Sequence, residues 1–84
     1  MTMTIRSRIV RRMNPLLYIR KVVFKVKQIE FAQIVGVGQA SVSRWENGEC
    51  SPSLDDMRAI REAAIERQIA WDDAWFFGVP QVAA

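Results

Sequence analysis

The sequence predicts an all-α domain built from five short helices. Apolar residues recur along most of the chain at spacings of three and four, which is the period of a helix with one buried face. Residues typical of helix starts and helix ends separate these segments, and no strand, repeat or low-complexity tract interrupts them. With 84 residues, half of them hydrophobic, the chain forms one small domain that buries about 60–65% of its unfolded surface.

The first helix is expected from about Pro15 to Phe24 or Lys25. Asn14 followed by Pro15 is typical of a helix start, because proline suits the first helical position. The inward residues of this helix are expected to be Leu16, Ile19, Val22, Val23 and Val26.

The segment QIEFAQIV, residues 28–35, predicts a second helix. Its inward residues are Phe31, Ala32 and Val35. Gly36 suits the C-terminal cap of this helix, and Gly38 allows a second bend before a third helix. Two short helices joined by a three-residue turn with glycine predict a helix-turn-helix.

The third helix, from about Gln39 to Glu46 or Asn47, divides its residues between two faces. At 100° per residue, Val42 and Trp45 share one side, and we expect them to anchor the helix in the core. The residues on the other side are small or hydrogen-bonding, with Gln39 at the edge: Ala40, Ser43, Arg44 and Asn47. Such side chains suit base edges and phosphates, although Asn47 also serves to end the helix.

Ser53 with Asp56 three residues later predicts a capping box at the start of a fourth helix. This helix runs from about Leu54 to Arg67. Its inward residues are expected to be Leu54, Met57, Ile60 and Ala64. Asp72 and Asp73 then supply N-terminal acids to a fifth short helix at AWFF, which Gly78 and Pro80 end.

The C-terminal aromatic residues, Trp71, Trp75, Phe76 and Phe77, are many for so small a domain. Two interpretations stay open. In the first, all four belong to the core of the monomer. In the second, some pack on the first and fourth helices and the others form a dimer contact.

The charge is divided unevenly along the chain. Residues 1–48 hold nine basic and two acidic residues, a net charge of +7, whereas residues 49–84 carry −4. This division favours a protein with one side turned toward a polyanion. We expect residues 1–13 to form a flexible basic arm, residues 14–80 the folded domain and residues 81–84 a disordered tail. Three interpretations of the arm stay open. Its arginines enter an adjacent minor groove, its arginines stay solvated, or the arm is an upstream extension without a role.

Catalysis and metal binding are not expected. The chain has no histidine, which is the commonest general base and the commonest metal ligand. Cys50 is the single cysteine, so no internal disulfide is expected and a reducing cytosol suits the chain. No apolar run approaches the roughly 20 residues of a membrane span, and no secretory signal is recognised. We therefore expect a soluble cytoplasmic protein that is not an enzyme and carries no cofactor or metal.

The run QIEFAQIVGVGQASVSRWENGECSPSL resembles the Cro/C1-type, or XRE-like, helix-turn-helix family. The similarity is dense over residues 28–54 and looser over residues 16–66. The matching positions are Gln28, Phe31-Ala32, Gly36-Val37, Gln39, Val42-Ser43, Trp45-Glu46, Asn47-Gly48 and Pro52. The resemblance implies a lambda-repressor-like domain.

Two positions depart from the family pattern. The family usually has Leu and Arg eight and seven residues before the glutamine that opens the second helix, where this chain has Arg20 and Lys21. One extra residue in the first loop restores the pattern, and Arg20 then forms the family's semi-buried ion pair with Glu46. Ile29 replaces a charged residue, so it is either partly exposed or a sign of tilted first helices.

The resemblance implies that the third helix enters the major groove of DNA and that the start of the second helix lies on the backbone. Gln39 suits adenine and Arg44 suits guanine. The residues expected at bases are Gln39, Ala40, Ser43 and Arg44. The residues expected at phosphates are Gln28, Ser41, Asn47, Lys25 and Lys27.

The predicted function is a sequence-specific transcriptional regulator of bacterial or phage origin, associated with the nucleoid. A homodimeric repressor on a palindromic operator is the expected form, because a two-fold dimer spaces its recognition helices by one turn of DNA. The alternative is an interaction protein, such as an antitoxin, that binds a partner protein through Trp71–Phe77.

Overall fold

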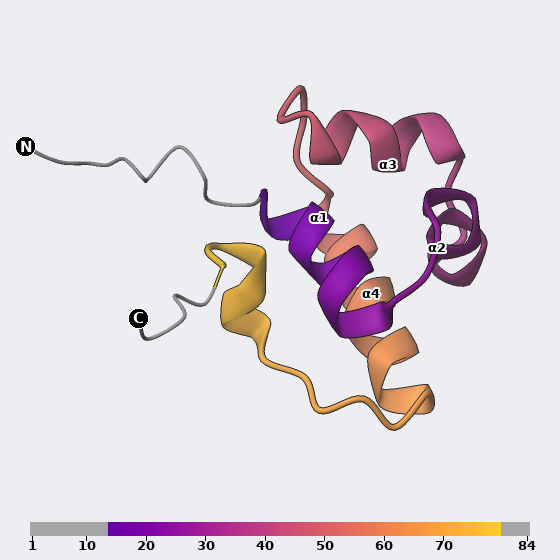
Figure 1. Ribbon diagram of the computed structural model, residues 1–84, viewed down its shortest axis with the longest axis vertical. Coiled ribbons are helices and arrows are strands. Elements are labelled where there is room, and N and C mark those ends of the chain that lie inside the picture. Colours follow the sequence, from indigo (N-terminus) through magenta and orange to yellow (C-terminus); the bar gives the residue numbers. More distant parts are fainter. Residues whose placement is uncertain (1–13, 80–84) are drawn as a thin grey trace, which may run out of the picture.

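The computed structural model describes residues 14–79, and this part of the chain is helical without any strand. The elements in order are α1 (Pro15–Tyr18), the π-helix η2 (Ile19–Phe24), α2 (Gln28–Val35), α3 (Gln39–Glu46), α4 (Leu54–Glu66) and the 3-10 helix η3 (Asp73–Phe76). In Figure 1, α3 lies at one edge of the fold, α2 at its side, and η3 at the opposite end from α2. None of these helices combines the length and hydropathy that a membrane span requires.

The all-α fold class is confirmed, but the prediction of five short helices differs from the structure in its count. Residues 14–79 contain four α-helices. The first expected helix changes from α to π geometry at Ile19, and the fifth is a single 3-10 turn that begins at Asp73. The expected arm at residues 1–13 and tail at residues 81–84 lie outside the described residues.

The first helix begins and ends at residues with clear capping roles. The Asn14 side chain accepts a hydrogen bond from the Leu16 N–H at 2.8 Å, and Pro15 occupies the first helical position. At the other end Lys25 adopts the left-handed conformation, with φ of 61°, and its N–H donates to the Arg20 carbonyl. This bond spans five residues, which is the π-helical pattern.

The π turn changes which apolar residues of the first helix reach the core. Ile19 and Phe24, five residues apart, are both buried, whereas Val22 is 43% exposed. The expectation that Val22 points inward is therefore wrong, because the wider turn rotates Phe24 onto the buried side instead. The loop before α2 comprises residues 25–27.

The helix-turn-helix consists of α2 and α3. Gly36 caps α2 with φ of 86°, a left-handed conformation that favours glycine, and its N–H donates to the Ala32 carbonyl. Gly38 precedes α3 with φ of −75° and ψ of 153°, an extended conformation that any residue adopts. The second bend therefore does not require glycine at position 38.

The predicted capping box of α4 is confirmed. The Asp56 N–H donates to the Ser53 hydroxyl at 3.0 Å, and the Ser53 N–H donates to the Asp56 carboxylate at 3.1 Å. Ile60 and Ala64 are buried as expected, but Leu54 is 71% exposed. The expectation for Leu54 is wrong because α4 packs through its later turns, and its first turn extends past that contact.

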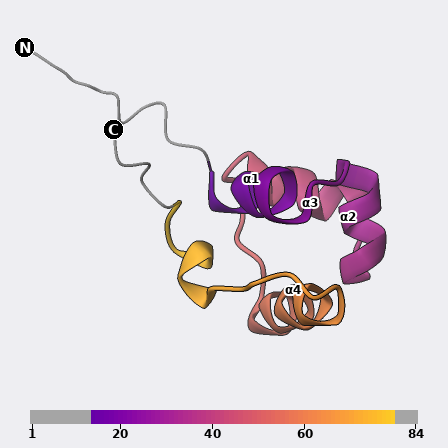
Figure 2. The same ribbon diagram turned by 60° about the horizontal axis from the view of Figure 1, so that its bottom comes forward.

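The core lies where the four α-helices and η2 meet (Figure 2). Phe31 of α2, Val42 of α3 and Ile60 of α4 are each completely buried. The Phe24 and Phe31 rings meet edge to face with centroids 5.1 Å apart. The remaining buried members are Leu16, Ile19, Ala32, Val35, Trp45, Ala63 and Ala64.

The four C-terminal aromatic residues differ in burial, which decides between the two interpretations of this segment. Trp71, Trp75 and Phe76 are half-buried and pack against the core. Trp75 meets Tyr18 of α1 with ring centroids 5.9 Å apart, which attaches η3 to α1. Phe77, in contrast, is 81% exposed, so the interpretation that places all four in the monomer core is wrong.

Trp45→Ala is expected to lower the free energy of unfolding by about 3–5 kcal/mol, because it removes a large side chain from a packed core. Trp45 is 4% exposed, whereas its neighbour Arg44 is exposed. Arg44→Ala is the matched control, with a change within about 0.5 kcal/mol. Denaturation of both variants tests this, and equal melting temperatures would contradict the assigned orientation of α3.

Candidate nucleic-acid interface

The side of α3 away from the core carries polar and small residues in exposed positions. Gln39, Ala40, Arg44 and Asn47 are exposed, and Ser43 is half-buried. We call Gln39, Ala40, Ser43 and Arg44 the contact face. The same helix buries Val42 and Trp45 on its other side. Figure 1 shows α3 at the edge of the fold, away from η3.

An ion pair with largely buried side chains lies at the end of α3. The Arg20 guanidinium binds the Glu46 carboxylate through two hydrogen bonds, Nε to Oε2 at 2.5 Å and Nη2 to Oε1 at 3.0 Å. The two side chains are only 11% and 7% exposed. Two parallel bonds of this kind fix orientation as well as distance. The pair therefore joins η2 to the last residue of α3.

Arg20 also holds the loop that leads into α2. Its Nη1 donates to the Val26 carbonyl at 3.1 Å, and the Val26 N–H donates to the Arg20 carbonyl at 3.2 Å. The two bonds fix residues 25–27 against η2. Lys25 and Lys27 consequently project from a defined position beside the start of α2, and both are exposed.

Gln28 connects the starts of the two helices of the helix-turn-helix. Its Nε2 donates to Glu46 Oε1 at 3.1 Å, and its Oε1 accepts from Gln39 Nε2 at 3.2 Å. Gln28 is half-buried and Gln39 is exposed. A continuous set of side-chain hydrogen bonds thus runs from Arg20 through Glu46 and Gln28 to the contact face.

The electrostatics of this side favour an anionic partner. Residues 14–48 hold five basic and two acidic residues. Glu46 is paired with Arg20, and the Glu30 carboxylate accepts the Lys27 N–H at 2.9 Å. Both acids are therefore engaged in contacts within the fold. The arrangement offers positive charge at the start of α2 and hydrogen-bonding groups along α3, which suits phosphates and base edges.

The structure brings together Gln28, Gln39, Arg20 and Glu46 of the residues singled out in the sequence. Lys25 and Lys27 flank the start of α2, and Ser41, half-buried, and Asn47, exposed, lie in the first turn and at the end of α3. The bonds that Gln28 makes to Glu46 and Gln39 were missed. They join residues 18 and 11 positions apart, and no helical period relates residues on different helices. Between residues 14 and 79, no cluster of three or more His, Cys, Asp or Glu side chains could hold a metal ion.

Arg20→Leu is expected to lower the free energy of unfolding by about 3–5 kcal/mol, because it leaves the buried Glu46 carboxylate without its partner. The double variant Arg20→Leu/Glu46→Leu should recover part of this loss, since neither charge remains. Urea denaturation measures both effects.

The control for this test is Arg58→Leu in the exposed Arg58–Asp55 pair, where the side chains are 56% and 89% exposed. It should change stability by less than about 1 kcal/mol. A loss as small for Arg20→Leu as for Arg58→Leu would show that the Arg20–Glu46 pair does not hold the helices together.

Comparison with known proteins agrees with this geometry. A family model described as helix-turn-helix matches residues 18–63, which is more than half of the chain and includes α2, α3 and both partners of the buried ion pair. No curated protein and no solved structure matches the chain. The chain belongs to the Cro/C1-type, or XRE-like, helix-turn-helix family of DNA-binding transcription regulators.

Proposed function

We propose that this DNA-binding regulator is a dimeric repressor that inserts α3 into the major groove of a palindromic operator. The observation that carries the proposal is the contact face, whose exposed polar residues lie on a helix fixed from beneath by Val42, Trp45 and the Arg20–Glu46 pair. A rigid helix with short and planar polar side chains matches the dimensions and the hydrogen-bonding pattern of the major groove.

Within the contact face, each side chain suits one kind of base contact. The Gln39 amide pairs with adenine N6 and N7, and the Arg44 guanidinium pairs with guanine O6 and N7. Ala40 contacts a thymine methyl group, and Ser43 reaches a base or a phosphate. Each bidentate contact contributes roughly 1–3 kcal/mol of discrimination against the wrong base.

The residues around this face supply contacts to the DNA backbone. We expect Gln28, Ser41 and Asn47 to bind phosphates, and the free backbone N–H groups at the start of α2 to add to these contacts. Lys25 and Lys27 are exposed beside that helix start. Their charges release counterions from the DNA, so they raise affinity without sequence preference and make it depend on salt.

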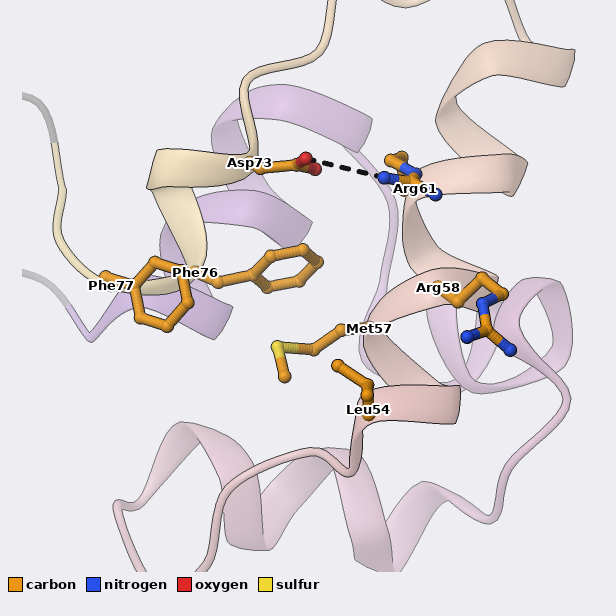
Figure 3. Close-up of a pocket in the computed structure, with 7 residues that line it drawn as sticks. All are labelled: Leu54, Met57, Arg58, Arg61, Asp73, Phe76 and Phe77. Atoms are coloured by element: carbon orange, nitrogen blue, oxygen red, sulfur yellow. Dashed lines mark hydrogen bonds and ion pairs between the residues drawn. The ribbon is translucent and has the colours of Figure 1, made fainter.

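For the dimer we propose the groove between α4 and η3. This hollow of about 310 Å³ is lined by Leu54, Met57, Arg58, Arg61, Asp73, Phe76 and Phe77. Figure 3 shows the Phe76 ring and the Met57 side chain turned into it, with Phe77 at its rim. Leu54 and Phe77 are 71% and 81% exposed, and large apolar groups so exposed are typical of interaction sites.

A second copy of the chain suits this groove. The groove offers both an apolar hollow and a protruding Phe77, so two copies related by a two-fold axis insert identical rings into each other. Its charges are balanced, because Arg61 pairs with Asp73 at 3.5 Å and Arg58 with Asp55 at 3.3 Å. A dimer formed here leaves α3 free. To bind a palindromic operator, the dimer has to present its two copies of α3 to successive major grooves, about 34 Å apart.

Arg44→Ala is expected to relax base preference at one symmetric pair of operator positions, because it removes a bidentate contact to guanine. Selection from randomised duplex DNA at about 150 mM salt measures this for wild type and variant, since affinities compare only at fixed salt. Lys27→Ala is the control and should weaken binding uniformly without changing the selected sequence. Enrichment of the same sequence by wild type and Arg44→Ala would contradict the assigned role of Arg44.

Phe77→Glu is expected to convert the dimer to a monomer, because it places a charge in the apolar centre of the interface. Ile65→Glu is the matched control, since Ile65 is also an exposed apolar residue, at 60%, but lies outside the groove. Sedimentation equilibrium of both variants measures the effect. A wild-type monomer, or a dimer unaffected by Phe77→Glu, would contradict the proposed interface. A wild-type monomer would also favour the alternative function, a partner-binding adaptor.

A further inference from the structure

We propose that Glu46, the last residue of α3, sets the orientation of the Gln39 amide through Gln28 and thereby determines base preference at the position that Gln39 contacts. Glu46 is thus a positioning residue for recognition. The proposal rests on the proposed function in one respect, the contact of Gln39 with a base.

The orientation begins at the buried ion pair. A guanidinium can only donate hydrogen bonds and an ionised carboxylate can only accept them. Glu46 Oε1 already accepts from Arg20 Nη2 at 3.0 Å, and Gln28 approaches the same oxygen at 3.1 Å. Gln28 must therefore turn its Nε2 toward Glu46, because its own oxygen would meet another acceptor. The side-chain oxygen of Gln28, Oε1, then points toward Gln39 of the contact face.

The orientation of the Gln39 amide follows from that of Gln28. Since Gln28 presents an oxygen, Gln39 must present its Nε2, which lies 3.2 Å from it. Gln39 and Glu46 are seven residues apart on α3, two turns along one side of the helix, and the Gln28 side chain spans the distance between them. Each amide in this series has one allowed orientation, and Glu46 determines both.

The orientation of the Gln39 amide determines which base it pairs with. After the bond to Gln28, Gln39 retains one N–H donor and its Oε1 acceptor. Adenine presents the matching pair in the major groove, the N7 acceptor and the N6 amino donor. Guanine presents two acceptors, N7 and O6, so the Gln39 oxygen meets an acceptor there. An amide free to turn its NH2 group toward the DNA would accept guanine more readily.

The constraint on side-chain orientation is strongest at Glu46 and weakest at Gln39, because exposure to water increases from the first residue to the second. Arg20 and Glu46 are 11% and 7% exposed, Gln28 is half-buried and Gln39 is exposed. A reversed amide at Gln28 would place two oxygens together where little water is available, which is costly. Gln39 alone, in water, has no such constraint. The buried residue therefore supplies an orientation that the exposed residue lacks.

The test compares affinities for operators that carry adenine or guanine at the position contacted by Gln39. The variant Gln39→Ala identifies this position. Two variants remove the constraint. Glu46→Gln offers Gln28 either an oxygen or an amino group, and Gln28→Met removes the link while it leaves the ion pair intact. For both variants the ratio of adenine to guanine affinity should fall about tenfold, within the range of one bidentate contact. Preference at the Arg44 position should be unchanged.

Two further variants separate orientation from stability. Arg20→Lys weakens the ion pair but keeps the Glu46 carboxylate, so the adenine preference should persist. The double variant Gln28→Glu/Glu46→Gln again presents an oxygen to Gln39, because the carboxylate at position 28 accepts hydrogen bonds from both amides. It should recover the preference for adenine despite a lower overall affinity. A ratio in Gln28→Met equal to that of wild type would overturn the proposal. If Gln39→Ala changes no position, Gln39 does not contact a base, and the proposed function fails at that residue together with this inference.

Discussion

The Arg20 guanidinium, carried by η2, contacts two other segments of the protein at once, the loop at Val26 and the end of α3 at Glu46. A buried ion pair of this kind adds little net stability, because desolvation offsets its attraction, but the loss of either partner is costly. Its effect is therefore to exclude other arrangements of the helices. The start of α2 and both ends of α3 are held in one relative position, which recognition of DNA by two helices requires.

The π turn of η2 is the local consequence of this constraint. Arg20 has to reach Glu46 while Ile19 and Phe24 are buried on the core side. An α-helix does not bring residues five positions apart onto one side, whereas the wider turn does. The left-handed Lys25 then ends the helix, and the chain enters α2 after three residues.

Local patterns predicted the parts of the fold that depend on neighbours in sequence. The bounds of α2 and α3, the inward positions of Val42 and Trp45 and the capping box at Ser53 all follow from helical period and cap chemistry. The exposure of Leu54 and the π turn did not follow, because both depend on how far each helix overlaps its neighbours. The bonds of Gln28 were also beyond prediction, since they depend on how an amide of α2 is oriented toward two residues of another helix, α3. The residues of the contact face were named from the sequence, and the structure adds what lies beneath them.

The most direct test of this account is to map the amide chemical shifts of the labelled protein as it is titrated with its selected operator duplex. We expect the largest changes at the start of α2 and along the contact face, with smaller changes at Glu46 and Arg20. Amides in the middle of α4 should be nearly unaffected. Large changes confined to α4 and η3, with α3 unchanged, would contradict the central claim that α3 is the surface that binds DNA.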